Sequence, residues 1–257
     1  MDKETKGQAG GFDLACECGQ AGGLPFMGEC DEYVHCTVSR TYINEEESKL
    51  IMKPAGRYVS LFFGNVWELG SEARDEIADL LARELVCASK TVLDKSSPKI
   101  LVVGLGNDEM VFDSVGSRVC GRLEADGESL FVFKSVVFGK SGIKSRDLVK
   151  NLVACVGADI VVAVDSLVAR SDARVGRVIQ LADSGIAPGS GVGKHLGKID
   201  RQSVGVPVLA LGVPSALFSG EELSELGYLA IPQTVLLIVE KSSEILANAL
   251  KTFALEM

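Results

Sequence analysis

Basic clusters, long apolar runs and histidine are scarce in this 257-residue sequence, and each shortage excludes a class of function. The formal net charge is −9 and lysine and arginine form no run, so we expect no direct contact with nucleic acid, whose phosphates need a basic surface. No run of about 18 or more apolar residues occurs, and the first residues, MDKETKGQAGG, lack the apolar centre of a signal peptide. We therefore predict a cytoplasmic protein that does not enter a membrane.

Cysteine occurs seven times, but in no familiar disulfide or metal pattern. An odd number of thiols at irregular spacing favours free cysteines in a reducing compartment. Four cysteines near His35 make zinc an alternative for this group: Cys16, Cys18, Cys30 and Cys36. The group lacks the C-x2-C pairs that are typical of zinc sites. We therefore predict no metal and no cofactor.

Several well-known motifs are present only in incomplete form. The GLGN of residues 104–107 is followed by DEM rather than by a further glycine, and carboxylates there would repel a pyrophosphate. The GSGVGKH of residues 189–195 resembles a phosphate loop, but Pro188 stands where that loop has its first glycine and His195 where it has Ser or Thr. No G-x-S-x-G motif occurs, and the two histidines are poor partners for a serine nucleophile. Catalysis by carboxylate side chains is therefore the chemistry that the sequence still allows.

Apolar runs alternate with amphipathic segments through the middle of the chain. This alternation predicts an α/β fold with a doubly wound, mostly parallel sheet flanked by helices. Predicted strands cover residues 34–42, 58–63, 99–105, 130–138, 160–164, 178–181 and 206–212, and predicted helices cover 71–90, 115–123, 145–157 and 240–253. We expect one domain over residues 12–257, preceded by a polar, Gly-rich segment, 1–11, that is disordered or removable.

Two of the predicted strands run into a carboxylate. Residues 160–164 lead to Asp165, and residues 178–181 lead to Asp183, which a loop rich in Gly, Ser and Pro follows. Ligands bind beyond the carboxyl ends of parallel strands, so we expect both carboxylates at one edge of the sheet, beside the loop of residues 107–113. The alternative is that both aspartates only cap turns. Paired carboxylates share a proton, and one of them can then activate water.

Four segments together resemble the germination (spore) protease family: VGLGNDEMVFDSVG, VVAVDSLVARSDARV, IQLADSGIAPGSGVG and GVPVLALGVPS. Their order and spacing match the family, and the Gly-Ser-Gly-Val-Gly loop is the most specific part. FDLACE at residues 12–17 is similar to the family's mature N-terminus. The resemblance extends over roughly residues 12–257 and identifies the chain as a divergent and shorter member.

The resemblance implies a cytoplasmic endopeptidase of the spore core, made as a zymogen in endospore-forming bacteria. It further implies self-assembly, small acid-soluble spore proteins as substrates, and a fold similar to that of hydrogenase-maturation peptidases. The two essential carboxylates of the family map onto Asp113 and Asp183, which we predict to be the catalytic pair. We predict supporting roles for Asn107, Asp165, Ser184, Gly189, Ser190, Gly191 and Gly193.

Departures from the family pattern leave two alternatives open. Val111 and Phe112 replace Thr-Pro before Asp113, and Lys194 replaces Asn at the end of the Gly-rich loop. One alternative is a catalytically impaired paralogue with a binding or regulatory role in spores. The other is a maturation peptidase whose carboxylates bind the metal of a metalloprotein, against which the scarcity of histidine in the central region weighs.

Overall fold

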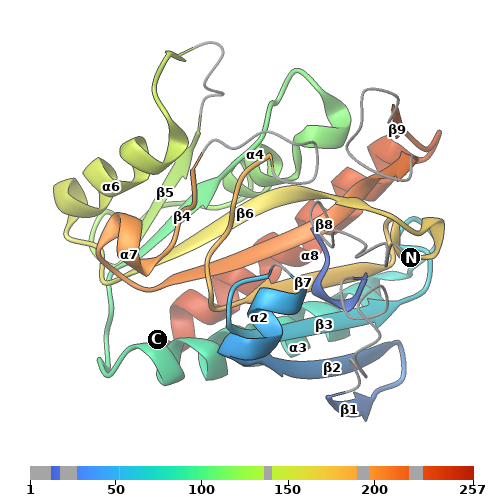
Figure 1. The fold of residues 1–257 in the computed structure, drawn as a ribbon, viewed down its shortest axis with the longest axis horizontal. Coiled ribbons are helices and arrows are strands. Elements are labelled where there is room, and N and C mark those ends of the chain that lie inside the picture. Colours follow the sequence, from blue (N-terminus) through green and yellow to red (C-terminus); the bar gives the residue numbers. More distant parts are fainter. Residues whose placement is uncertain (1–12, 18–27, 52, 136–140, 190–196, 220–227) are drawn as a thin grey trace, which may run out of the picture.

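The computed structural model describes residues 13–17, 28–51, 53–135, 141–189, 197–219 and 228–257. Its strands form one nine-stranded sheet in the order β1-β2-β3-β7-β8-β6-β4-β5, with β9 paired to β8 (Figure 1). The strands are β1 (Glu29–Glu32), β2 (Cys36–Ile43), β3 (Gly56–Phe63), β4 (Ile100–Gly104), β5 (Leu130–Lys134), β6 (Ile160–Ala169), β7 (Val178–Ala182), β8 (Val208–Ser219) and β9 (Tyr228–Ala230).

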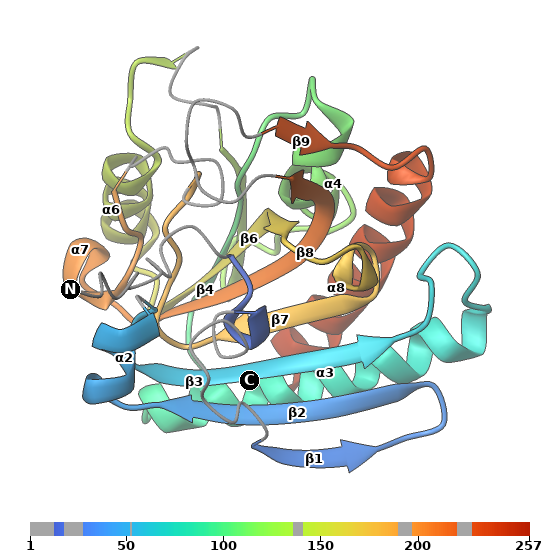
Figure 2. The same cartoon turned by 45° about the vertical axis from the view of Figure 1, so that its right-hand side comes forward.

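Helices cover both faces of the parallel part of this sheet (Figure 2). One face packs on α3 (Ser71–Val92), α4 (Val115–Cys120) and α8 (Val235–Glu256). The other face packs on α6 (Ser145–Val156) and α7 (Arg201–Val204), with α2 (Glu45–Ile51) beside β2 and β3. Two short 3-10 turns, η1 (Val111–Asp113) and η2 (Asp172–Arg174), follow β4 and β6.

The side chains of β6 alternate between two apolar cores. Ile160, Val162 and Val164 belong to the core that includes α3 and α8. Val161 and Ala163 belong to the core that includes α6 and α7. Side chains two residues apart in a strand share a face, so Asp165 points to the α6 side of the sheet.

The long helices follow the sequence pattern. The helix predicted over residues 71–90 is α3, and the one predicted over 145–157 is α6. Gly157 ends α6 in the left-handed conformation, at φ 65°, where a glycine has no side chain to clash. The last helix begins five residues before its predicted start at residue 240, at Val235.

The prediction of a mostly parallel sheet is wrong, because the sheet is mixed. In the described part of the chain β4–β5, β4–β6 and β6–β8 are parallel, whereas the pairings from β1 to β7, β7–β8 and β8–β9 are antiparallel. A parallel crossover needs about a dozen residues or more. The connection from β6 to β7, residues 170–177, is shorter than that, so β7 returns in the opposite direction.

Two central strands are longer than predicted. β6 continues through Asp165 to Ala169, and β8 continues through Pro214 to Ser219. The two strands pair along this extension, with a register shift between Leu167 and Val168. Pro214 lies opposite Leu167 at that irregularity, where a missing N–H donor is tolerated.

Two expectations concern the first residues of the chain and the absence of a membrane span. The segment predicted to be disordered or removable, residues 1–11, lies outside them. Among the helices that are described, none combines the length and the apolar character needed to span a membrane.

Candidate active site

The loop after β4 fixes the carboxylate of Asp113. Gly106 adopts φ 98°, and a β carbon there would lie 2.2 Å from the carbonyl oxygen of Asp113, so the loop closes only around a glycine. The N–H of Asn107 donates to the carbonyl oxygen of Asp113 at 2.8 Å and to its Oδ2 at 3.0 Å. Asn107 therefore supports Asp113 through its main chain.

The turn that carries Asp113 is tied to the two neighbouring strands. Ser215 of β8, which is fully buried, donates its hydroxyl hydrogen to the carbonyl oxygen of Phe112. The N–H of Val115, at the start of α4, donates to Oγ of Ser166 on β6 at 3.2 Å. Asp113 is thus held at the carboxyl end of β4, next to β6 and β8.

Asp165 lies inside the sheet at this same end and is 7% exposed. Its Oδ1 accepts a hydrogen bond from the N–H of Ser166 at 2.9 Å. Burial first, and then the negative charges of Asp113 and Asp13, hold the pKa of Asp165 well above its ordinary value. Asp113 and Asp165 are therefore within electrostatic reach of each other, and Asp165 favours the protonated form.

A short N-terminal segment, Asp13–Glu17, crosses the sheet beside Asp165. Oδ2 of Asp13 accepts from the N–H of Val168 at 2.9 Å. The carboxylate of Glu17 accepts from the N–H groups of Arg170 and Ser171, at 2.9 to 3.0 Å. Both acidic side chains thus bind the main chain at the end of β6.

Gln180 of β7 binds the same segment through its side-chain amide. Its Oε1 accepts from the N–H of Ala15 at 2.6 Å, and its Nε2 donates to the carbonyl oxygen of Asp13 at 3.3 Å. Our sequence reasoning missed this residue. Its signal is a glutamine in the middle of VIQLA, a strand buried at every position, because a glutamine in such a place needs hydrogen-bond partners.

Gln180 and Asp165 belong to one row of residues across the sheet. Both lie opposite Gly212 of β8, and the row continues from Gln180 to Ser60 and Ser39. Residues in register on neighbouring strands point to the same face. A hollow of about 280 Å³ lies on this face, lined by residues of the N-terminal segment and by hydroxyl side chains of β2 and β3: Ala15, Cys16, Thr37, Ser39, Thr41, Tyr58 and Ser60.

The structure does not bring Asp183 to Asp113 and Asp165, so the expectation of one shared edge is wrong. β7 runs antiparallel to β8, and Asp183 lies three residues beyond Gln180, toward the start of β8. At about 3.3 Å per residue and about 4.8 Å per strand, the Cα atoms of Asp165 and Asp183 are about 14 Å apart. The strand direction, which the local pattern does not contain, decides this separation.

Asp183 has its own surroundings at the other end of the sheet. Its Oδ1 accepts from the N–H of Arg57 at 2.8 Å. Burial raises the pKa of Asp183, and the N–H and positive charge of Arg57 oppose this rise. The next residue, Ser184, donates its hydroxyl hydrogen to the Tyr58 hydroxyl at 2.9 Å. Asp183 and Ser184 thus anchor the start of the Gly-rich loop to β3.

The Gly-rich loop is described only in part. Gly189 adopts φ 78° and is partly exposed. Ser190, Gly191 and Gly193, which were predicted to support the site, lie outside the described residues.

Comparison with known proteins agrees with the sequence motifs. Residues 26–225 match the family model described as germination protease. The chain belongs to the germination protease family. It is 33% identical over 189 residues to a germination protease of Clostridium perfringens and 34% identical over 194 residues to one of Priestia megaterium. These alignments cover 68% and 70% of this chain but 57% and 52% of the relatives, so the chain spans about half the length of the curated relatives it matches.

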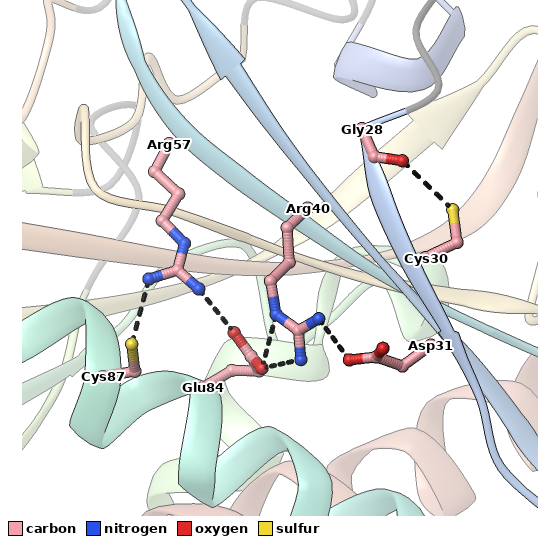
Figure 3. Close-up of polar contacts among 7 residues, drawn as sticks. All are labelled: Gly28, Cys30, Asp31, Arg40, Arg57, Glu84 and Cys87. Atoms are coloured by element: carbon pink, nitrogen blue, oxygen red, sulfur yellow. Dashed lines mark hydrogen bonds and ion pairs between the residues drawn. The ribbon is translucent and has the colours of Figure 1, made fainter.

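A charged cluster joins the antiparallel strands of this family member to α3 (Figure 3). Glu84 of α3, with a side chain 8% exposed, accepts from Nε and Nη2 of Arg40 at 2.9 and 2.6 Å through one oxygen. Its other oxygen accepts from Nη2 of Arg57 at 3.0 Å. Arg40 also pairs with Asp31 of β1 at 2.6 Å. The cluster fixes Arg57, whose main chain binds Asp183.

Cys16, Cys30 and Cys36, the described cysteines of the possible zinc site, do not gather with His35 into a group that could hold a metal ion. Cys30 is exposed, Cys36 is buried with its pKa raised to about 12 by burial, and His35 pairs with Glu76. Cys18 lies outside the described residues. In the part of the chain that is described, no three His, Cys, Asp or Glu side chains are grouped so as to hold a metal ion.

Proposed function

We propose that this chain is an endopeptidase of spore germination in which Asp113 and Asp165, rather than Asp113 and Asp183, form the acid–base pair. The observation that supports this pair is the electrostatic coupling of Asp113 to the buried Asp165 at the carboxyl end of the parallel strands. That end is the usual place of a site in an α/β sheet. Asp183, about two strands away, has an anchoring role in this proposal.

The unequal surroundings of the two carboxyl groups assign their roles. Asp165 is buried and keeps its proton, so it donates a hydrogen bond to the carbonyl oxygen of the scissile peptide. Asp113 is partly exposed and accepts a proton from the attacking water. The proton then passes to the leaving amine as the tetrahedral intermediate collapses. The bond that breaks is the peptide C–N bond, and water supplies the hydroxyl group.

The likeness to the germination proteases supports further parts of the proposal. The substrates are small acid-soluble spore proteins, and cleavage takes place in the cytoplasm of the spore core. The enzyme assembles with copies of itself, and residues 1–11 are removed from an inactive precursor. Mass spectrometry of the protein from sporulating and germinating cells tests the last point, because a mature form that keeps residues 1–11 throughout contradicts it.

The test of the catalytic pair compares three aspartate-to-asparagine variants on an extract of acid-soluble spore proteins. Asp113→Asn and Asp165→Asn each lower the cleavage rate by roughly a hundred- to ten-thousandfold, because each removes acid–base help. Asp183→Asn keeps most of the activity, since the amide oxygen still accepts from the N–H of Arg57. Loss of activity in Asp183→Asn with full activity in Asp165→Asn contradicts the assignment. A wild-type protein that binds the extract proteins without cleaving them supports the impaired paralogue instead.

A further inference from the structure

We propose that Asp13 is a positioning residue of the active site, whose negative charge keeps the proton on Asp165 and so fixes Asp165 as the acid and Asp113 as the base. This inference rests on the proposed function and adds a third carboxylate to it. The carboxylate reaches the site from the N-terminal segment, residues 13–17, and its contact with Val168 of β6 spans 155 residues.

The N-terminal segment is built into the fold rather than laid on it. Leu14 and Ala15 are 0% and 1% exposed, and Glu17 is 5% exposed. At the two ends of the segment, the carboxylates of Asp13 and Glu17 accept hydrogen bonds from main-chain N–H groups that follow Asp165. Between them, the oxygen and the nitrogen of the Gln180 side-chain amide bind the main chain of the segment. Asp13 therefore has a fixed position beside β6.

Among the described residues, the charged groups that act on Asp165 are both negative. Asp113 approaches from η1 and Asp13 from the N-terminal segment, and both charges act on Asp165. The in-register neighbours on β8 and β7 are Gly212 and Gln180, which are neutral. Within its own strand, the N–H of Ser166 is the donor that favours the ionised form of Asp165.

A nearby cation, Arg170, interacts with both acidic residues of the segment. Arg170 follows β6, and its pKa is lowered by burial and raised by the charges of Glu17 and Asp13. Arg170 thus attracts both acidic side chains of the segment and helps to hold the segment beside β6.

The two acidic residues of the segment offer a matched pair of variants. Asp13→Asn keeps an oxygen acceptor for the N–H of Val168 and removes the charge that acts on Asp165. Glu17→Gln removes the other acidic group of the same segment, at a side chain that binds the N–H groups of Arg170 and Ser171 and is not among the groups acting on Asp165. Asp13→Glu keeps the charge.

The experiment follows the Asp165 carboxyl by carbon NMR in protein labelled at aspartate, with Asp165→Asn to assign the signal. The midpoint of its titration moves to lower pH in Asp13→Asn and stays at the wild-type position in Glu17→Gln and Asp13→Glu. An unchanged midpoint in Asp13→Asn overturns the proposal, and so does an equal shift in Asp13→Asn and Glu17→Gln. Circular dichroism of each variant confirms that the compared proteins are folded.

A second readout links the charge to cleavage. The alkaline limb of the pH profile of kcat/KM, where the acid loses its proton, moves to lower pH in Asp13→Asn and not in Glu17→Gln. A lower rate in Asp13→Asn with an unmoved limb overturns the role in protonation. Failure of the proposed function can be told apart from failure of this inference. An Asp165→Asn protein that still cleaves contradicts the catalytic pair, whereas the NMR titration still tests whether Asp13 raises the pKa of Asp165.

Discussion

Glu84→Gln tests the charged cluster that joins α3 to the antiparallel strands. Glu84 accepts three charge-assisted hydrogen bonds from Arg40 and Arg57, and its side chain is 8% exposed. Glutamine supplies an amide oxygen to one arginine only and turns its NH2 group, a donor, toward the other. The variant therefore leaves two guanidinium groups without the carboxylate that they share, and Arg40 keeps only its pairing with the exposed Asp31.

The size of the effect follows from burial. Removing one partner of a fully buried ion pair costs about 3–5 kcal/mol. The side chains of Arg40 and Arg57 are 20% and 22% exposed, so water reaches part of each group and we expect the lower end, about 3 kcal/mol. For a chain of this size about 1 kcal/mol corresponds to about 2–4 °C, so the melting temperature falls by about 6–12 °C.

The assay is urea unfolding of Glu84→Gln beside Glu76→Gln, a control on the same helix. Glu76 pairs with His35 where the two side chains are 25% and 33% exposed, so its loss costs less than about 1 kcal/mol. Below the melting temperature, the cleavage rate per folded molecule is unchanged, because the cluster does not touch Asp113 or Asp165. If Glu84→Gln unfolds at the same urea concentration as Glu76→Gln, the reasoning from burial is refuted.

Three further outcomes are expected. Gly116→Ala places a β carbon 2.4 Å from a carbonyl oxygen of β6, so it lowers the free energy of unfolding, measured in urea, by about 2–3 kcal/mol. The control Gly121→Ala places a β carbon no closer than 3.6 Å to any atom, at a residue with a helical φ, so it is neutral or slightly stabilising in the same measurement. The free energy of unfolding of the wild type falls as pH rises through the titration of Asp165, whose folded pKa lies above the unfolded one, and an equally steep fall in Asp165→Asn contradicts this. Burial raises the pKa of Cys36 to about 12 and of Cys120 to about 11, so a thiol reagent at pH 8 modifies them only after unfolding, as peptide mass spectrometry can show.

Much of the fold could be predicted because it depends on local patterns. The period of apolar residues predicts α3 and α6, and continuous apolar runs predict β4 and the first half of β6. β1 has the sequence ECDE and is exposed throughout, so it carries no apolar signal and exists only by pairing with β2. The extension of β6 to Ala169 likewise depends on pairing with β8.

The candidate site could be predicted only in part, for a related reason. Asp165 and Asp183 were found from their places after apolar runs, and Asp113 from the resemblance to the family. Which two lie together depends on the direction of β7. That direction is set by the length of a connection and by pairing with β8, and the residues around Asp183 do not contain it. Asp13 was noticed only as part of a family-like segment, because its contact with Val168 spans 155 residues.

The row that runs from Asp165 to Ser39 restricts where this chain can gain or lose residues during evolution. A single insertion or deletion inside β3, β7 or β8 would turn every later side chain of that strand to the opposite face. Gln180 would then point into the apolar core beside α3, and Ile179 or Leu181 would take its place under the N-terminal segment. Changes of length are therefore tolerable between strands and not within them.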